Sequence, residues 1–180
     1  MSSLPEACIA DWTKLWRLAQ RLALEERDEP ASVFERIGLF LEDPAEQRRC
    51  DYDVTPANSI MIASTGGDGV HFSALVTGSG GSAPIVMTVP MAFDTPNHVL
   101  GSDLREFLAL GRARGYFGLE RLAYQWERPE AIAQLQADYE PTGSRQAEML
   151  QLLIEEFDLQ PWRDVGERLD ELASAHSAQL

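Results

Sequence analysis

The sequence predicts an α+β protein, in which N-terminal helices are followed by an antiparallel β-meander and then by C-terminal helices. Three observations support this class. Apolar residues recur at helical spacing in the first forty or so positions, a pattern typical of amphipathic helices. Residues 59–90 contain short apolar runs separated by glycine-rich turns. Helical spacing with capping and proline signals returns from Ser102 onward, so helices and strands are segregated along the chain rather than alternating.

The N-terminal part is predicted to form two helices and a loop. The apolar stripe of the first helix consists of Ile9, Trp12, Trp16, Ala19 and Ala23. Pro5 suits its first turn. A shorter helix is expected over residues 32–42, ending at Asp43-Pro44 because the residue before a proline avoids the helical conformation. Residues 45–58 are polar and are interpreted as a loop.

Residues 59–90 are predicted to form a three-stranded antiparallel meander, with strands at 60–63, 70–76 and 85–89. In the second strand the even-numbered residues are apolar, so this strand is expected to place one face on the core. His71 and Ser73 would lie on the other, outward face. The turn before this strand contains Asp68 and the structural glycines Gly66, Gly67 and Gly69. A short fourth strand is expected at residues 98–100.

The remaining chain is predicted to be helical. Asp103-Leu-Arg-Glu106 has the spacing of a capping box, in which side chains satisfy the free backbone N–H groups of a helix start. An apolar stripe follows between Leu119 and Trp126. Proline and glycine breakers separate three further helices, expected at residues 129–139, 144–157 and 161–172.

The charge of the chain restricts its partners. The 180 residues, which we expect to form a single domain, carry a formal net charge of −14 and only one lysine. No lysine or arginine occurs between Cys50 and Leu104. Such a charge repels phosphate backbones, so we expect no direct nucleic-acid binding and favour a basic protein as partner; the bland alternative is that acidity serves solubility. Neither a signal peptide nor an apolar membrane segment is recognisable, and two cysteines without CxxC spacing indicate reduced thiols, so we expect a cytoplasmic protein that does not associate with membranes.

Three segments carry a resemblance to a known family. Residues 62–72, 84–91 and 104–111 give the order of strand, glycine turn, second strand and Glu-Phe-Leu helix, and in this they resemble bacterial members of the SUKH superfamily. That superfamily includes toxin-immunity proteins and a yeast regulator of cell-wall synthesis. The resemblance covers about residues 30–125 and leaves 126–180 as a helical extension. It implies a binding module without catalytic residues.

Catalytic interpretations have little support in the sequence. Asp68 and His71 could meet across the hairpin turn as an acid–base pair or as half of a metal site, but such a site needs a third group. The alternative is that Asp68 shapes the turn and His71 lies outward on a strand. The glycine turn lacks the lysine and the following helix of a phosphate-binding loop. We therefore expect no catalytic residue, metal ligand or cofactor.

The sequence thus favours a non-catalytic module that binds and neutralises a polymorphic toxin domain. Loops carry recognition more readily than buried strands, so the expected partner-binding residues are those in or beside the lysine- and arginine-free loops. They are Asp51, Asp53, Asp68, His71 and Asp94. Two alternatives stay open: a regulatory or scaffolding protein of the same fold, and a small metal-dependent hydrolase using Asp68 and His71. The oligomeric state is left open.

Overall fold

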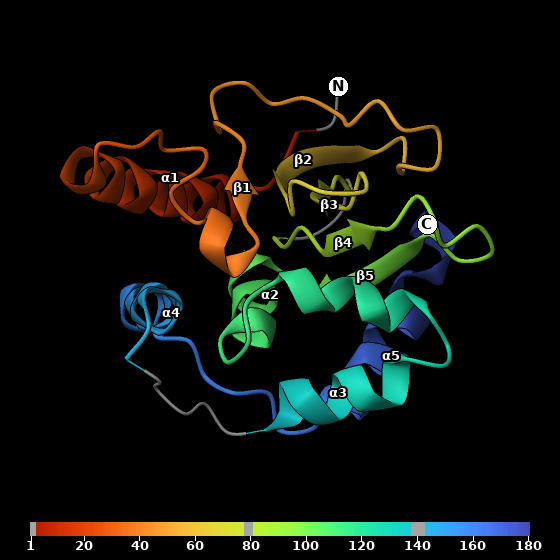
Figure 1. Cartoon of the computed structure of the whole chain (residues 1–180). Coiled ribbons are helices and arrows are strands. Elements are labelled where there is room, and N and C mark those ends of the chain that lie inside the picture. Colours follow the sequence, from red (N-terminus) through yellow and green to blue (C-terminus); the bar gives the residue numbers. More distant parts are fainter. Residues whose placement is uncertain (1–2, 78–80, 138–142) are drawn as a thin grey trace.

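The computed structural model describes residues 3–77, 81–137 and 143–180, and it has the predicted order of helix, antiparallel sheet and helices (Figure 1). The α+β class is confirmed. The α-helices are α1 (Glu6–Glu26), α2 (Leu104–Gly111), α3 (Arg128–Gln136), α4 (Arg145–Phe157) and α5 (Val165–His176). The strands are β1 (Phe40–Leu41), β2 (Ser59–Ser64), β3 (His71–Leu75), β4 (Ile85–Thr88) and β5 (Asn97–Gly101). Short 3-10 helices are η1 (Glu35–Ile37), η2 (Phe117–Ala123) and η3 (Ser177–Gln179).

The five strands form one antiparallel sheet in the order β1-β2-β3-β4-β5. The three predicted strands and the short fourth strand are all present, and β1 is an additional edge strand. Ser73 at the centre of β3 lies opposite Met61 of β2 and Val86 of β4. Each strand pairs with its neighbour along the chain, as is common in antiparallel sheets, although the connection between β1 and β2 is the long segment 42–58.

Both faces of the sheet are covered, although in different ways. On one face Tyr52 and Thr55, from the segment between β1 and β2, contact His71 of β3, whereas on the other face Phe107 of α2 packs against Phe72. Every residue of β3 and β4 is therefore buried, so the expectation that His71 and Ser73 face outward is wrong. Alternation along a strand shows which residues share a face, but it cannot show that a polar loop from elsewhere covers the second face.

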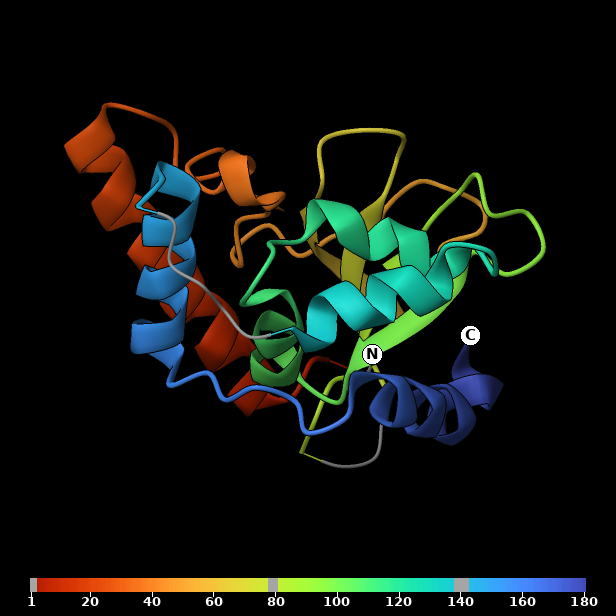
Figure 2. The same ribbon diagram turned by 60° about the horizontal axis from the view of Figure 1, so that its bottom comes forward.

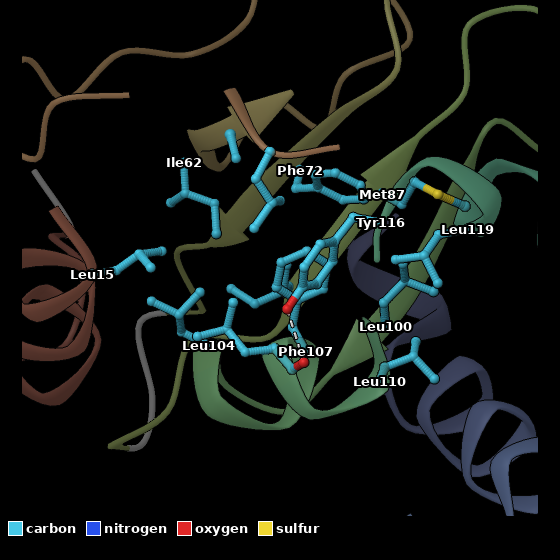
Figure 3. Close-up of a cluster of buried hydrophobic side chains, with 14 of the residues drawn as sticks. Leu15, Ile62, Phe72, Met87, Leu100, Leu104, Phe107, Leu110, Tyr116 and Leu119 are labelled. Carbon is cyan, nitrogen blue, oxygen red and sulfur yellow. Dashed lines mark hydrogen bonds between the residues drawn. The ribbon is translucent and has the colours of Figure 1, made fainter. Parts of the chain in front are cut away.

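The core is centred on three aromatic rings. Phe107 of α2 contacts Phe72 of β3 with ring centroids 4.8 Å apart, and it contacts Tyr116 at 5.2 Å (Figure 3). The hydroxyl of Tyr116 donates a hydrogen bond of 2.9 Å to the carbonyl oxygen of Leu108. Burial in this cluster raises the pKa of Tyr116 far above its ordinary value. The C-terminal helices contribute to the same cluster, for example through Leu153.

The helix predicted over residues 32–42 is absent, and this is the main correction to the predicted elements. The segment instead contains the single turn η1 and the edge strand β1. Gly38, between them, has a φ of 84° and ends the turn in the left-handed conformation. A side chain there would collide with the backbone nitrogen and ring of Phe117. The contact with Phe117 is distant in sequence, which explains why the apolar spacing of the segment was misleading.

The C-terminal elements largely follow the expectation. Asp103 caps α2 by accepting a hydrogen bond of 2.9 Å from the backbone N–H of Glu106, whose side chain accepts one of 2.6 Å from the N–H of Ser102. The predicted capping role of Asp103 is thus confirmed, and Glu106 bonds the N–H of Ser102, one residue before the N-cap. The stripe after Leu119 forms the 3-10 helix η2, and α5 begins at Val165, four residues later than expected, because Asp164 is its N-cap. Residues 138–139 of the range expected for α3 lie outside the described residues.

The turn between β2 and β3 requires two of its three glycines. Gly66 has a φ of 80° and Gly69 a φ of 72°, which are left-handed conformations that cost other residues energy. A side chain at Gly66 would collide with the ring of Phe40, and one at Gly69 with the ring of Tyr52. Gly67 has neither constraint, because its φ is not positive and a Cβ atom at this position would have no other atom within 4 Å.

We predict that Gly66→Ala and Gly69→Ala each lower the free energy of unfolding by about 1–2 kcal/mol from backbone strain alone, with more from the collision. Gly67→Ala, the matched control, should change it by less than about 1 kcal/mol. Urea unfolding followed by tryptophan fluorescence measures all three. Equal losses for the three variants would contradict the described turn.

Candidate functional site

Three loops meet at one end of the sheet, which we call the loop end and define by residues 50–58, 65–70 and 89–96. The strand register explains the meeting, because His71 at the start of β3 lies opposite Thr88, and Thr88 lies opposite Asn97 at the start of β5. The turn between β2 and β3 and the connection between β4 and β5 therefore leave the sheet at the same end. The view in Figure 2 shows both, with the 50–58 segment passing between them.

His71 is the buried centre of the loop end, and this corrects its predicted place on an exposed face. Only 1% of its surface is exposed. Its Nδ1 lies 2.7 Å from the carbonyl oxygen of Gly69 and its Nε2 lies 3.0 Å from the hydroxyl of Thr55. The ring is stacked on Tyr52 with centroids 5.9 Å apart. A carbonyl only accepts, so Nδ1 carries the proton and Nε2 of the neutral ring accepts from Thr55.

Arg49 holds the 50–58 segment in its course. Its guanidinium donates hydrogen bonds to the carbonyl oxygens of Tyr52 (3.2 Å), Pro56 (3.3 Å) and Thr55. A planar group with five N–H donors is suited to gathering several carbonyls of one loop. The sequence did not predict this role, since nothing in a polar segment shows which arginine will bind the backbone carbonyls of its own loop.

The 89–96 loop is also fixed by internal hydrogen bonds. Its ends are joined by the N–H of Val89, which donates to the carbonyl oxygen of Pro96 at 2.8 Å. Thr88 donates to the side-chain oxygen of Asn97 at 2.7 Å, and the amide of Asn97 donates to the carbonyl oxygen of Val54 at 2.9 Å. The last bond joins this loop to the 50–58 segment. Together with the contacts of His71, it makes the three loops one connected unit.

The structure brings the four predicted aspartates to the loop end. Asp51 and Asp53 belong to the first loop, Asp68 to the turn and Asp94 to the third loop, and all four are exposed. Within the described part of the chain, none of the four forms an ion pair. The nearby Arg49 is occupied by backbone carbonyls. Four carboxylates outnumber the single positive charge that Arg49 retains, so the loop end presents a net negative charge to solvent.

Glu120 adds to this charge, although no pattern in the sequence marked it as a candidate. It lies in η2 and is partly buried. Burial raises its pKa above the ordinary value, and the charges of Asp68 and Glu127 raise it further. Neighbouring carboxylates disfavour the charged form of this carboxyl group, and a nearby cation would stabilise that charged form. Only the tertiary approach of η2 to the turn could have revealed this residue.

Exposed apolar side chains lie among the carboxylates. In the 50–58 loop Tyr52 and Val54 are exposed, and in the 89–96 loop Met91 and Phe93 are exposed. Single exposed apolar residues are ordinary, but four of them in two joined loops form a feature of the surface. The sequence did show these residues within polar segments, and that contrast was the available signal.

The geometry does not support Asp68 and His71 as a catalytic or metal-binding pair. Both ring nitrogens of His71 are engaged by Gly69 and Thr55 inside the protein. Among the described residues, no group of three or more histidine, cysteine, aspartate or glutamate side chains could hold a metal ion.

Comparisons with known proteins identify no relative of this chain. The chain matches no protein-family model, no curated protein and no solved structure. The resemblance to the SUKH superfamily thus rests on the sequence segments alone. In the described ranges 3–77, 81–137 and 143–180, no helix has the length and apolar character needed to cross a membrane.

The burial of His71 generates a prediction about pH. Burial lowers its pKa below the ordinary 6.5, the positive charge of Arg49 lowers it further, and the bond to Gly69 opposes both. The unfolded chain therefore binds the proton first, so the stability contributed by neutral His71 is complete above pH 6.5 and is lost as pH falls toward the folded-state pKa. The slope this adds is at most about 1.4 kcal/mol per pH unit.

We predict that the free energy of unfolding declines more steeply between pH 7.5 and 5.5 in the wild type than in His71→Phe. Comparing the two proteins removes the contribution of His98, whose pKa is also lowered by burial. Urea unfolding at several pH values measures the slopes, and NMR titration of the His71 ring checks the pKa. Parallel curves would show that His71 does not titrate as its burial requires.

A second prediction concerns Arg49. Arg49→Lys keeps the charge but cannot reach three carbonyls, so the 50–58 loop should open more readily, by about 2 kcal/mol, with amide hydrogen exchange roughly 30-fold faster. Arg48→Lys is the matched control, because Arg48 is exposed and pairs with Glu42 at 2.8 Å. Unchanged exchange in Arg49→Lys would mean that other contacts hold the loop.

Proposed function

We propose that this chain is a non-catalytic binding module that captures a basic protein at the loop end. In its most specific form, the proposal is an immunity-type inhibitor that covers the active site of a toxin domain in the cytoplasm. The observation that carries it is the set of exposed aspartates without ion pairs, Asp51, Asp53, Asp68 and Asp94, on loops joined by hydrogen bonds of His71 and Asn97.

The electrostatic part of the argument follows from the position of the charge. Carboxylates that already have cationic partners contribute little to attracting another protein, whereas these four and Glu120 leave a net negative potential at one end of the molecule. Such a potential accelerates encounter with a positively charged surface and disfavours polyanions. A basic protein is therefore a better partner than a nucleic acid.

The structural part of the argument is that the loops need little ordering on binding. The backbone carbonyls of Tyr52, Val54 and Gly69 accept hydrogen bonds from Arg49, Asn97 and His71 respectively, so the conformation of the loops is set before a partner arrives. Preorganised loops lose less entropy on association than mobile ones. This property suits an inhibitor that must bind before its target acts.

The chemistry of the rest of the chain agrees with this proposal. Cys8 and Cys50 are both free, and burial raises the pKa of Cys8 to about 11, which makes it a poor nucleophile. The SUKH-like segments add support, since proteins of that superfamily act by binding. A regulatory protein would use the same surface for a cellular partner, and the following experiment separates the two.

We predict that a four-aspartate variant associates more slowly with the toxin domain whose gene lies beside the gene of this protein. The variant combines Asp51→Asn, Asp53→Asn, Asp68→Asn and Asp94→Asn. The reduction should be roughly tenfold at low salt and should shrink above about 0.15 M salt, where charges are screened beyond about 8 Å. Stopped-flow fluorescence at two salt concentrations measures it.

The matched control neutralises four exposed glutamates on α1, α4 and α5, changing Glu6, Glu25, Glu155 and Glu167 to glutamine. It alters the net charge equally but leaves the loop end intact. Equal effects of the two variants would assign the acidity to solubility. If no neighbouring toxin domain binds, the immunity function fails.

A further inference from the structure

The most exposed aromatic side chain of the sheet connections belongs to the 89–96 loop. Phe93 is 81% exposed and Met91 is 57% exposed, while Ala92 between them is buried and anchors the loop. Phenylalanine and methionine are enriched at protein interfaces, where their burial supplies much of the binding energy. Leaving both side chains exposed forgoes the free energy that burial of their apolar surface would supply, and the fold itself does not require this exposure.

The conformation of this loop is determined without either side chain. The N–H of Ala92 donates to the carbonyl oxygen of Val89 at 2.9 Å, and the N–H of Thr95 donates to that of Ala92 at 3.1 Å. His98 Nε2 lies 2.7 Å from the carbonyl oxygen of Thr95. Phe93 is thus presented on a fixed backbone, and little order remains to be gained when it is buried by a partner.

The surroundings of the loop combine apolar and acidic groups. Asp94 follows Phe93 directly, and the hydrogen bond from Asn97 brings Val54, with Asp53 beside it, to the same loop end. A protein-binding surface usually has an apolar centre and a polar rim, and here the exposed aspartates make the rim acidic. The charge of the rim then decides which partner fits.

We propose that Met91 and Phe93 are the apolar anchors of the loop end, and that its partner is a basic protein with an apolar pocket bordered by arginine or lysine side chains. This inference rests on the proposed function and adds the part of the partner that must be apolar. A second copy of the chain fits poorly, because two acidic loop ends would face each other and each copy carries a net charge of −14.

The test uses a displayed library of random 12-residue peptides, selected on the purified full chain. The expected peptides combine an aromatic or aliphatic residue with several arginines or lysines. The strongest peptide is synthesised, and fluorescence anisotropy then gives its dissociation constant for four proteins. These are the wild type, a Met91→Ser/Phe93→Ser variant, the four-aspartate variant described above, and Leu24→Ser.

The anchor variant should bind at least about 30-fold more weakly, as expected for hot-spot residues. Its thermal unfolding should be unchanged, because both side chains are exposed. Leu24 is the matched control, since it is 83% exposed but lies on α1. Leu24→Ser should bind within about twofold of the wild type.

The outcomes separate the two proposals. Loss of binding in the four-aspartate variant, with unchanged binding in the anchor variant, overturns this inference but leaves the proposed function standing. Selected peptides without basic residues, or binding that neither variant alters, overturn both, as does a selection that enriches no peptide. A dimer in sedimentation velocity that the anchor variant abolishes assigns the anchors to a second copy and also overturns the inference.

Discussion

The packing of Phe72, Phe107 and Tyr116 is the interaction on which the arrangement of the molecule depends. It joins the centre of the sheet to α2 and to the start of η2. Tyr116 is fixed from several sides, because its N–H donates to the carbonyl oxygen of Ile37 at 2.7 Å and its ring leaves no room for a side chain at Gly111. Truncating a buried aromatic residue of this kind costs about 3–5 kcal/mol. The cluster closes one face of the sheet with helices.

The opposite face and the loop end are built differently. At the loop end a histidine, an arginine and an asparagine bind backbone carbonyls and a hydroxyl, whereas farther along the same face Leu75, Val86 and Val99 are buried apolar residues. Polar contacts of this kind fix conformation because one side chain, as with Arg49, binds several carbonyls of one loop at once. The aromatic cluster thus provides stability, whereas the loop end provides a surface whose backbone is fixed and whose outward side chains can be exchanged.

The difference explains how much the sequence could predict. The strands, the Gly66 and Gly69 turn and the helix cap at Asp103 depend on neighbouring residues, so local patterns were sufficient. The helix expected at 32–42 does not form, because at Gly38 a contact with Phe117 determines the backbone conformation. At the candidate site, the exposed aspartates were predictable as loop residues. The burial of His71 was not, because it depends on a loop whose course is set by Arg49.

The hydrogen bonds within and between the loops have a consequence for how this surface can diverge among descendants of one ancestral chain. Most of them end on main-chain oxygen atoms, at Tyr52, Val54, Gly69 and Pro96, and such atoms are present whatever side chain the position carries. The outward side chains can therefore be exchanged by mutation while the scaffold keeps its shape. A lineage carrying this fold could follow a changing partner by altering a few codons, without having to evolve the fold again.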